Sequence, residues 1–228
     1  TSWKGRADLA MFDPSSTKAF TRSWIVDSLT TSPFATSMSY QRKLFYDGVN
    51  YWSFFFDGTD TVCKYSYDDG QTWVYSGRVF RTPRVNETSI WYDSSTSMVY
   101  AVGDTSSPSR NVTIQMGIVD ATAHKIYWTD KDTNLTTSTN PMAGKNTYIS
   151  KDSNGYLWVL ASNWTRIQPS QHGLGAFRSK AVNSTASWID TCGLSLPYGV
   201  LPWGVYEDNS KGSIVPAGSG SDVWAIYT

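Results

Sequence analysis

The chain has 228 residues and a formal net charge of zero, with 15% aromatic and 17% charged residues. The balanced charge gives no electrostatic attraction to nucleic acid or to an anionic membrane surface, and no apolar run is long enough to cross a bilayer, so neither partner is expected. Glutamate occurs only as Glu87 and Glu207, while aromatic, Ser, Thr and Gly residues abound, which favours an all-β fold.

The first elements expected along the chain are two strands, in segments 7–12 and 18–26, on either side of a turn at 13–16. In ring-shaped sheet proteins an amino-terminal strand commonly completes the last sheet and removes an exposed edge. The hairpin is therefore a candidate to close such a ring.

A sharper pattern begins at residue 42, where expected strands at 44–46, 51–56, 61–65 and 72–75 alternate with turns. Two of these turns, Asp47-Gly48 and Asp57-Gly58, lie between aromatic runs and are strong hairpin signals. Four successive strands are the content of one β-propeller blade.

The same layout recurs twice, and Asp47, Asp93 and Asp152, which open the first turn of each unit, are 46 and 59 positions apart. Such spacings are typical of propeller blades with variable loops. A fourth unit begins at 198 and lacks outer strands, which come either from the amino-terminal hairpin or from a longer native chain. We expect one propeller domain over 1–228, with four to five four-stranded antiparallel blades, or part of a larger propeller. The remaining expected strands are 89–92, 98–102, 112–119, 125–128, 147–152, 156–160, 175–179, 187–189, 203–206, 213–215 and 222–227.

One stretch, Ser66-Tyr67-Asp68-Asp69-Gly70-Gln71-Thr72-Trp73, matches the pattern Ser-x-Asp-x-Gly-x-Thr-Trp. It resembles the Asp-box of the BNR-repeat, sialidase-like β-propellers. The resemblance implies a turn between the two outer strands of a blade, in which Asp68 binds backbone amides, Gly70 has φ > 0 and Trp73 packs against the next sheet. Segment 150–158 is a looser relative. These roles are structural, so the motif predicts fold more than activity.

A sialidase-type activity is the alternative that this resemblance raises. Phe80-Arg81-Thr82-Pro83 is similar to the motif whose arginine grips the substrate carboxylate. Arg81 follows the box instead of preceding it, and Thr82 replaces an isoleucine, so Arg81 is only a ligand-binding candidate. Glu87 lies in a glycosylation sequon and Glu207 in an expected turn, and neither suits a base beside a nucleophilic tyrosine. We assign no catalytic residue.

Other polar residues suggest little chemistry. His124 and His172 lie in expected loops without a nucleophile elbow. The aspartates at 57–60 and 130–132 suit either calcium ligation or turns that bond their own backbone, and the turns are favoured. No metal or cofactor is expected. Most tryptophans should be core, whereas Trp164, inside a sequon, is a candidate for stacking on a sugar.

Five sequons occur, at Asn86, Asn111, Asn134, Asn163 and Asn183. Ordinary composition would give roughly two or three in such a sequence. Together with Thr1 at the start, the excess favours a secreted, N-glycosylated, extracellular or cell-surface product, a processed form or fragment of a longer protein. Cys63 and Cys192 would either bridge different blades or remain two buried thiols.

The favoured function is a non-catalytic extracellular glycoprotein for adhesion, carbohydrate binding or assembly into a cell-surface or virion-surface layer or filament. Its partners would be glycans, neighbouring copies or other surface proteins. The alternatives are a sialidase-type glycoside hydrolase, or a fragment whose active site is completed by missing blades. An enzyme should bring several acidic and arginine side chains together where the inner strands meet.

Overall fold

A computed structural model describes residues 8–9, 24–26, 41–83, 85–105, 112–129, 131–137, 140–141, 144–163, 173–190, 212–216 and 223–227. All regular structure in these ranges is antiparallel β-sheet, so the protein is all-β. No helix with the length and apolarity of a membrane span occurs within them.

The first sheet contains β3 (Leu44–Tyr46), β4 (Tyr51–Phe56), β5 (Thr61–Ser66) and β6 (Val74–Arg78), in chain order. Its first hairpin turn forms as the Asp-Gly signal predicts, because Gly48 has φ +103° and the Asp47 carboxylate accepts the Val49 N–H at 2.8 Å. Four strands, each paired with the next, confirm the predicted order.

Two further sheets repeat this order. The second has β7 (Val85–Asp93), β8 (Met98–Thr105), β9 (Val112–Asp120) and β10 (Lys125–Trp128), with β11 (Thr133–Asn134) paired to β9 beyond the end of β10. The third has β14 (Gly144–Lys151), β15 (Leu157–Asn163), β16 (Gly173–Ser179) and β17 (Trp188–Asp190). Three short pairs remain: β1 (Asp8–Leu9) with β2 (Trp24–Ile25), β12 (Thr136–Thr137) with β13 (Asn140–Pro141), and β18 (Gly212–Pro216) with β19 (Val223–Tyr227).

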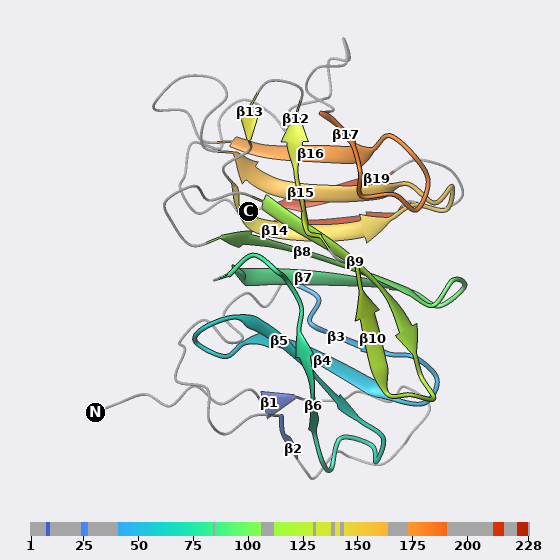
Figure 1. The fold of residues 1–228 in the computed structure, drawn as a ribbon. Coiled ribbons are helices and arrows are strands. Elements are labelled where there is room, and N and C mark those ends of the chain that lie inside the picture. Colours follow the sequence, from blue (N-terminus) through green and yellow to red (C-terminus); the bar gives the residue numbers. More distant parts are fainter. Residues whose placement is uncertain are drawn as a thin grey trace.

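The sheets stack face to face in chain order (Figure 1). Side chains of β8 alternate between two cores: Val99 and Ala101 join the core against the first sheet, and Tyr100 and Val102 join the core against the third. A strand buried on both faces needs apolar residues at successive positions, as in the Met98–Val102 run. The second sheet therefore holds its two neighbours together.

The first strands of neighbouring sheets also lie against one another, β7 beside β14 and β14 beside β18. Two hydrogen bonds cross between them and the segment before β3: Gln41 Nε2 donates to the Thr147 carbonyl at 2.9 Å, and Thr147 Oγ1 donates to the Glu87 carbonyl at 3.1 Å. These strands form the inner side of the stack.

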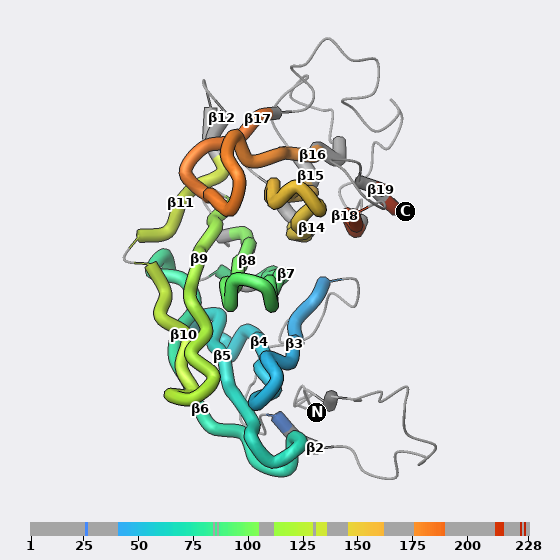
Figure 2. The backbone as a smooth tube through the Cα atoms, turned by 90° about the vertical axis from the view of Figure 1, so that its right-hand side faces the viewer, coloured from blue at the N-terminus to red at the C-terminus, as the bar shows by residue number. Residues whose placement is uncertain are grey.

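The two short end hairpins pack on different sheets. Val26, directly after β2, packs on Phe55 and Val62 of the first sheet, whereas β18 packs beside β14 and β15 (Figures 1 and 2). The amino-terminal hairpin thus does not supply outer strands to β18–β19, which pair only with each other among the described strands. The described ranges form no closed ring, and the expected strand at 203–206 lies outside them.

Candidate functional site

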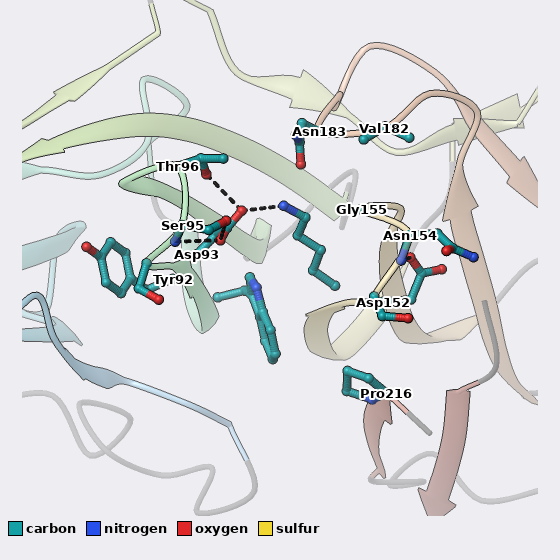
Figure 3. A pocket seen from close by; sticks show the side chains of 14 residues that line it. Tyr92, Asp93, Ser95, Thr96, Asp152, Asn154, Gly155, Val182, Asn183 and Pro216 are labelled. Atoms are coloured by element: carbon teal, nitrogen blue, oxygen red, sulfur yellow. Dashed lines mark hydrogen bonds and ion pairs between the residues drawn. The ribbon is translucent and has the colours of Figure 1, made fainter. Parts of the chain in front are cut away.

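A pocket of about 620 Å³ opens where the turns of several sheets converge (Figure 3). One wall is the turn between β7 and β8, and the facing wall is the turn between β14 and β15. The turn after β16 and the end of β18 complete it. The lining residues are Trp91, Tyr92, Asp93, Ser94, Ser95, Thr96, Lys151, Asp152, Ser153, Asn154, Gly155, Val182, Asn183 and Pro216.

Asp93 is the most heavily bonded side chain of the pocket. Its carboxylate accepts from the Ser95 N–H at 3.0 Å, the Ser95 hydroxyl at 2.6 Å and the Thr96 hydroxyl at 2.8 Å, and it pairs with Lys151 Nζ. Burial alone would raise the pKa of Asp93, but the bonds from Lys151, Ser95 and Thr96 outweigh it and hold the pKa well below its usual value. Asp93 therefore stays ionised at any physiological pH.

The Asp93–Lys151 ion pair joins the second sheet to the third. The side chains of both residues are only 11% exposed, so solvent screens the pair weakly. Lys151 is the last residue of β14, and its neighbour Asp152 begins the opposite turn. The pair therefore fixes the distance between the two walls of the pocket.

The equivalent turns explain why Asp93 is available to a lysine. In the first sheet the Asp47 carboxylate accepts the indole N–H of Trp52 at 2.7 Å, and in the third the Asp152 carboxylate accepts that of Trp158 at 2.9 Å. Each tryptophan is the second residue of the second strand. Asp47 and Asp152 thus each bind an indole N–H across the first hairpin of their sheet.

In the second sheet the corresponding residue is Val99, which is paired with Tyr92 in the register that places Trp52 opposite Phe45. The side chain of Val99 has no N–H to donate. Asp93 Oδ2 is therefore left to bind Thr96 and Lys151. The sequence spacing pointed to the three aspartates but missed Lys151. The replacement of tryptophan by Val99 is the signal that would have found it.

The turn after β16 packs closely against the β14–β15 turn. Gly155 has φ +89°, and a Cβ there would stand 2.6 Å from Val182 Cγ1. The Asn183 N–H donates to the Gly155 carbonyl at 2.9 Å, and Asn183 itself has φ +53°. Asn183 Oδ1 is buried without a hydrogen-bond partner among the described residues. This oxygen is enclosed by the protein and is not open to the pocket.

The Asp-box turn lies between β5 and β6, the two outer strands of their sheet. Asp68 Oδ1 accepts the Thr72 N–H and the Ser66 hydroxyl, both at 2.8 Å, and Gly70 has φ +83°. The pKa of Asp68 is lowered, mainly by the Thr72 hydroxyl and N–H. Trp73 packs on the small core around Phe55. The turn is a local hydrogen-bonded unit outside the pocket.

The looser relative at 150–158 is placed differently. It spans the first hairpin turn of the third sheet, between β14 and β15, and forms a pocket wall. The outer turn of that sheet is 180–187, between β16 and β17. The resemblance of 150–158 to an Asp-box therefore does not extend to its position in the sheet.

Arg81 is exposed in the loop after β6 and does not line the pocket. Its N–H donates to Asp132 Oδ1 at 3.0 Å, and its carbonyl accepts from Arg78 Nη2 at 3.0 Å. The same carboxylate accepts from the Thr82 N–H and from Gln115 Nε2. Asp132, a candidate calcium ligand from sequence, thus binds this loop to the second sheet.

The other candidate calcium segment is also a turn. Asp57 Oδ1 accepts the Thr59 N–H at 2.7 Å and the Asp60 N–H at 2.9 Å, while Asp60 pairs with Arg78 at 3.1 Å. In the described part of the chain no three His, Cys, Asp or Glu side chains are grouped as metal ligands.

His124 bridges the first and second sheets. Its Nδ1 lies 2.7 Å from Asn50 Oδ1, and its ring stacks on Tyr65 with centroids 5.2 Å apart. Asn50 Nδ2 donates to the Ala121 carbonyl and to Asp47, so Asn50 Oδ1 is the acceptor and His124 Nδ1 the donor. The histidine thus has a structural partner in Asn50. His172 lies outside the described residues.

Cys63 is a fully buried free thiol whose Sγ donates to the Gly77 carbonyl at 3.5 Å. Burial raises its pKa to about 12, so it is not a reactive nucleophile. Cys192 lies outside the described residues, as do Trp164 and Asn111. Of the other sequon asparagines, Asn86 is in β7, Asn134 is exposed in β11, Asn163 ends β15, and Asn183 lines the pocket.

A second polar cluster lies at the inner strands. Asn146, in a bulge of β14 with φ +55°, donates its N–H to Glu87 Oε2 at 2.9 Å, and Lys43 stands directly before β3. Burial lowers the pKa of Lys43 to about 8, against the opposing effect of Glu87. Asp104 lies opposite Glu87 in the register of β7 and β8, so the described residues bring two acids and one lysine together here, without the arginines expected of a sialidase-type centre.

No family model matches the sequence, and neither does any curated protein. Solved structures do resemble the fold. A protein of unknown function from Dyadobacter fermentans is 18% identical with a TM-score of 0.53, over 77% of this chain and 45% of that one. This chain thus spans less than half of that protein.

Two other similar structures are glycan-active proteins. An endo-arabinase from Bacteroides thetaiotaomicron is 10% identical with a TM-score of 0.50, over 90% of this chain and 79% of that one. A family PL25 ulvan lyase, bound to -[GlcA(1-4)Rha3S]-, is 13% identical with a TM-score of 0.53, over 91% and 52%. At these identities the likeness concerns the fold.

Proposed function

We propose that this protein is a non-catalytic carbohydrate-binding protein, and that a sugar chain binds in the pocket between the β7–β8 and β14–β15 turns. The observation that carries the proposal is the composition of this pocket. The pocket is lined by the hydroxyl and amide side chains of Ser94, Ser95, Ser153 and Asn154, and by an ionised Asp93 that is paired with Lys151.

These groups suit a neutral polyhydroxylated ligand. Sugars are recognised by a few fixed donors and acceptors together with an aromatic wall. Trp91 lines the pocket and supplies such a wall.

The state of Asp93 supports binding without hydrolysis in this pocket. A glycoside hydrolase needs one carboxyl group that is protonated and able to donate to the leaving oxygen. The pKa of Asp93 is held in the opposite direction. Asp152 uses its carboxylate on Trp158 and on the N–H groups of Asn154 and Tyr156. The carboxylates of Asp93 and Asp152 are thus both engaged in bonds that hold the structure.

The sheets themselves support the wider assignment. We infer that they are blades of a β-propeller, because each has four strands in chain order, with β11 added beside β9 in the second, and each packs face to face on the next. The Asp-box turn at an outer hairpin is in keeping with the BNR-repeat group, and the likeness to an endo-arabinase and to an ulvan lyase supports a carbohydrate-related function.

The test is calorimetric titration with two probes, arabino-oligosaccharides and oligosaccharides that contain glucuronate and rhamnose. We expect saturable binding of at least one probe. The double variant Ser94→Ala/Asn154→Ala, which removes rim groups and leaves the ion pair, should weaken it at least tenfold. Thr122→Ala, an exposed turn residue outside the pocket, is the matched control and should bind as the wild type does.

Equal affinity in the rim variant and the control would place binding elsewhere and contradict the proposal. The same probes, incubated with the protein, should release no reducing ends and no ultraviolet-absorbing unsaturated product. Release of either would show an enzyme.

Glycoside hydrolysis is the second candidate, and the observation that favours it is Glu87 at the inner strands, where Lys43 and the strained Asn146 adjoin it. If activity is found, Glu87→Gln should abolish it while calorimetric binding persists. Loss of both together would indicate that Glu87 only supports the bulge.

We also propose that the protein is secreted and N-glycosylated. The exposed Asn134 and the turn residue Asn183 are the sequon sites whose surroundings the structure gives. Intact mass before and after enzymatic deglycosylation of the native protein tests this, and an unchanged mass would contradict it.

A further inference from the structure

A row of side chains leads from the pocket outward across the second sheet. Asp93 lines the pocket and is paired with Met98 on β8. Met98 is paired in turn with Ile118 on β9, and Ile118 with Tyr127 on β10. Directly paired residues share one face of a sheet, so the four side chains form a single row. The row ends on the edge strand of the sheet, three strand spacings or about 14 Å from Asp93.

The row lies on the face of the second sheet that is directed to the third. Met98 packs against the core shared by these two sheets, whereas Ile126, the neighbour of Tyr127, belongs to the core on the opposite face. The two outer members of the row are largely uncovered, since Ile118 is 57% exposed and Tyr127 is 50% exposed. The third sheet therefore covers the row near the pocket and leaves its outer half open to solvent.

The pocket is also bordered by the outer part of the third sheet. Val182 and Asn183 line it, and both belong to the turn between β16 and β17, the two outer strands of that sheet. Val182 is itself 47% exposed. Outer elements of both sheets thus adjoin the pocket, with the exposed half of the row on one of them.

We propose that Ile118 and Tyr127 form an outer subsite, on which one unit of a sugar chain packs while another unit of the same chain fills the pocket. This inference rests on the proposed carbohydrate binding and adds that the ligand is an oligosaccharide, because a single sugar ring is shorter than the row. A sugar ring packs its apolar face on an aromatic side chain. Adjacent exposed apolar side chains in line with a pocket are typical of a ligand-binding groove.

Lys125 adds polar groups to this subsite. It precedes Tyr127 by two residues on β10, so it shares the same face, and its Nζ lies 5.0 Å from the centre of the Tyr127 ring. The exposure of Tyr127 is what remains with Lys125 in place, so part of the side chain stays accessible. An ammonium group has three donors for sugar hydroxyls. The subsite thus combines an apolar surface with donors, as sugar sites do.

Calorimetric titration with short and long saccharides tests the subsite. The probes are arabinobiose and arabinohexaose, together with a disaccharide and a hexasaccharide that contain glucuronate and rhamnose. The wild type should bind the hexasaccharide of at least one series several times more tightly than the disaccharide. Tyr127→Ala should lower the hexasaccharide affinity about fivefold, the effect of losing one aromatic contact, and leave the disaccharide affinity unchanged.

Two further variants serve as controls. Tyr127→Phe keeps the ring and should bind the hexasaccharide as the wild type does. Tyr75→Ala is the matched exposed tyrosine, because Tyr75 is 59% exposed on β6, the outer strand of the first sheet, and does not line the pocket. It should leave both affinities unchanged, and circular dichroism should show the same sheet content for all variants.

The outcomes separate this inference from the proposed function. If Ser94→Ala/Asn154→Ala weakens binding and Tyr127→Ala does not, the pocket binds sugar and the outer subsite is wrong. An equal loss for both saccharide lengths in Tyr127→Ala would also overturn the subsite, because the effect would not depend on reaching the end of the row. A wild type that binds none of the probes would overturn the proposed function, and the subsite with it.

Discussion

The Asp93–Lys151 pair shows how one missing indole changes the role of a repeated aspartate. In Asp47 and Asp152 one carboxylate oxygen accepts a hydrogen bond from a tryptophan of the same sheet. In Asp93 the equivalent oxygen binds Lys151 of the next sheet. The equivalent aspartate therefore binds within its own sheet in the first and third sheets, but links two sheets in the second.

Removing either member of this pair should be costly. We expect Lys151→Met to lower the free energy of unfolding by about 2 kcal/mol, because it leaves a largely buried carboxylate without its cation. Asp93→Asn/Lys151→Met should cost less than the sum of the single changes. Urea unfolding of the three variants measures the coupling, and additive effects would show that the two side chains do not interact.

The same pair predicts a loss of stability in acid. The folded-state pKa of Asp93 lies below its unfolded value, so the carboxylate contributes stability above the unfolded pKa and loses it as the pH falls through the folded pKa. Asp93→Asn should therefore differ most from the wild type near neutral pH and least in strong acid. A difference that is constant between these limits would contradict the lowered pKa.

Lys43 predicts a further gain of stability with rising pH, in the alkaline range. Its pKa is about 8 in the folded chain and 10.5 for the ordinary group, so between these values the unfolded chain binds more protons. The free energy of unfolding should rise over this window, by on the order of 1–3 kcal/mol. Lys43→Met, measured by urea unfolding across the same pH range, should lose this rise, and an unchanged slope would refute the assignment.

At the scale of the element, the Asp-box turn is stabilised almost entirely from within. Its serine, aspartate and threonine bond one another and the backbone between residues 66 and 72. We expect such a unit to govern local order between β5 and β6 more than the affinity of the distant pocket.

Gly70→Ala should lower stability by about 1 kcal/mol, because φ +83° disfavours any residue with a Cβ. Gln71→Ala in the same turn is the control and should be nearly neutral. Asp68→Ala should accelerate hydrogen exchange at the Thr72 amide, which loses its acceptor. Unchanged exchange there would show that the carboxylate does not order the turn.

Much of each element could be predicted from local sequence. The Asp-Gly turns and the spacing of Asp47, Asp93 and Asp152 located equivalent hairpins, because turn chemistry is set by neighbouring residues. Lys151 was missed because its partner is 58 positions away and is chosen by packing between sheets. Segment 150–158 was likened to an Asp-box, although its composition fits the first hairpin turn, where the structure places it.

At the scale of the whole molecule, the expectation that the amino-terminal hairpin completes the last sheet fails among the described residues. Val26 finds an apolar site on the first sheet, on Phe55 and Val62, and this holds the hairpin at that end. No local pattern encodes which distant face a short hairpin will cover, so sequence reasoning could name the strands but not their final neighbours.

The shared middle sheet predicts how the molecule unfolds. Ile90→Ala in one core should cost about 2–4 kcal/mol and Phe177→Ala in the other about 3–5 kcal/mol. Because the second sheet forms both cores, both variants should still unfold in one transition, with additive costs in the double variant. Two separated calorimetric transitions would show that the sheets unfold independently.

Every strand of the three large sheets pairs with strands close to it in sequence, and this has a consequence during biosynthesis. Residues 44–78 contain a full sheet before the next is translated, so each can form as it leaves the ribosome. A nascent sheet then displays a bare apolar surface until its successor arrives. A pause in translation between sheets would prolong that exposure, and a chaperone that binds extended apolar surfaces would be needed most at those moments.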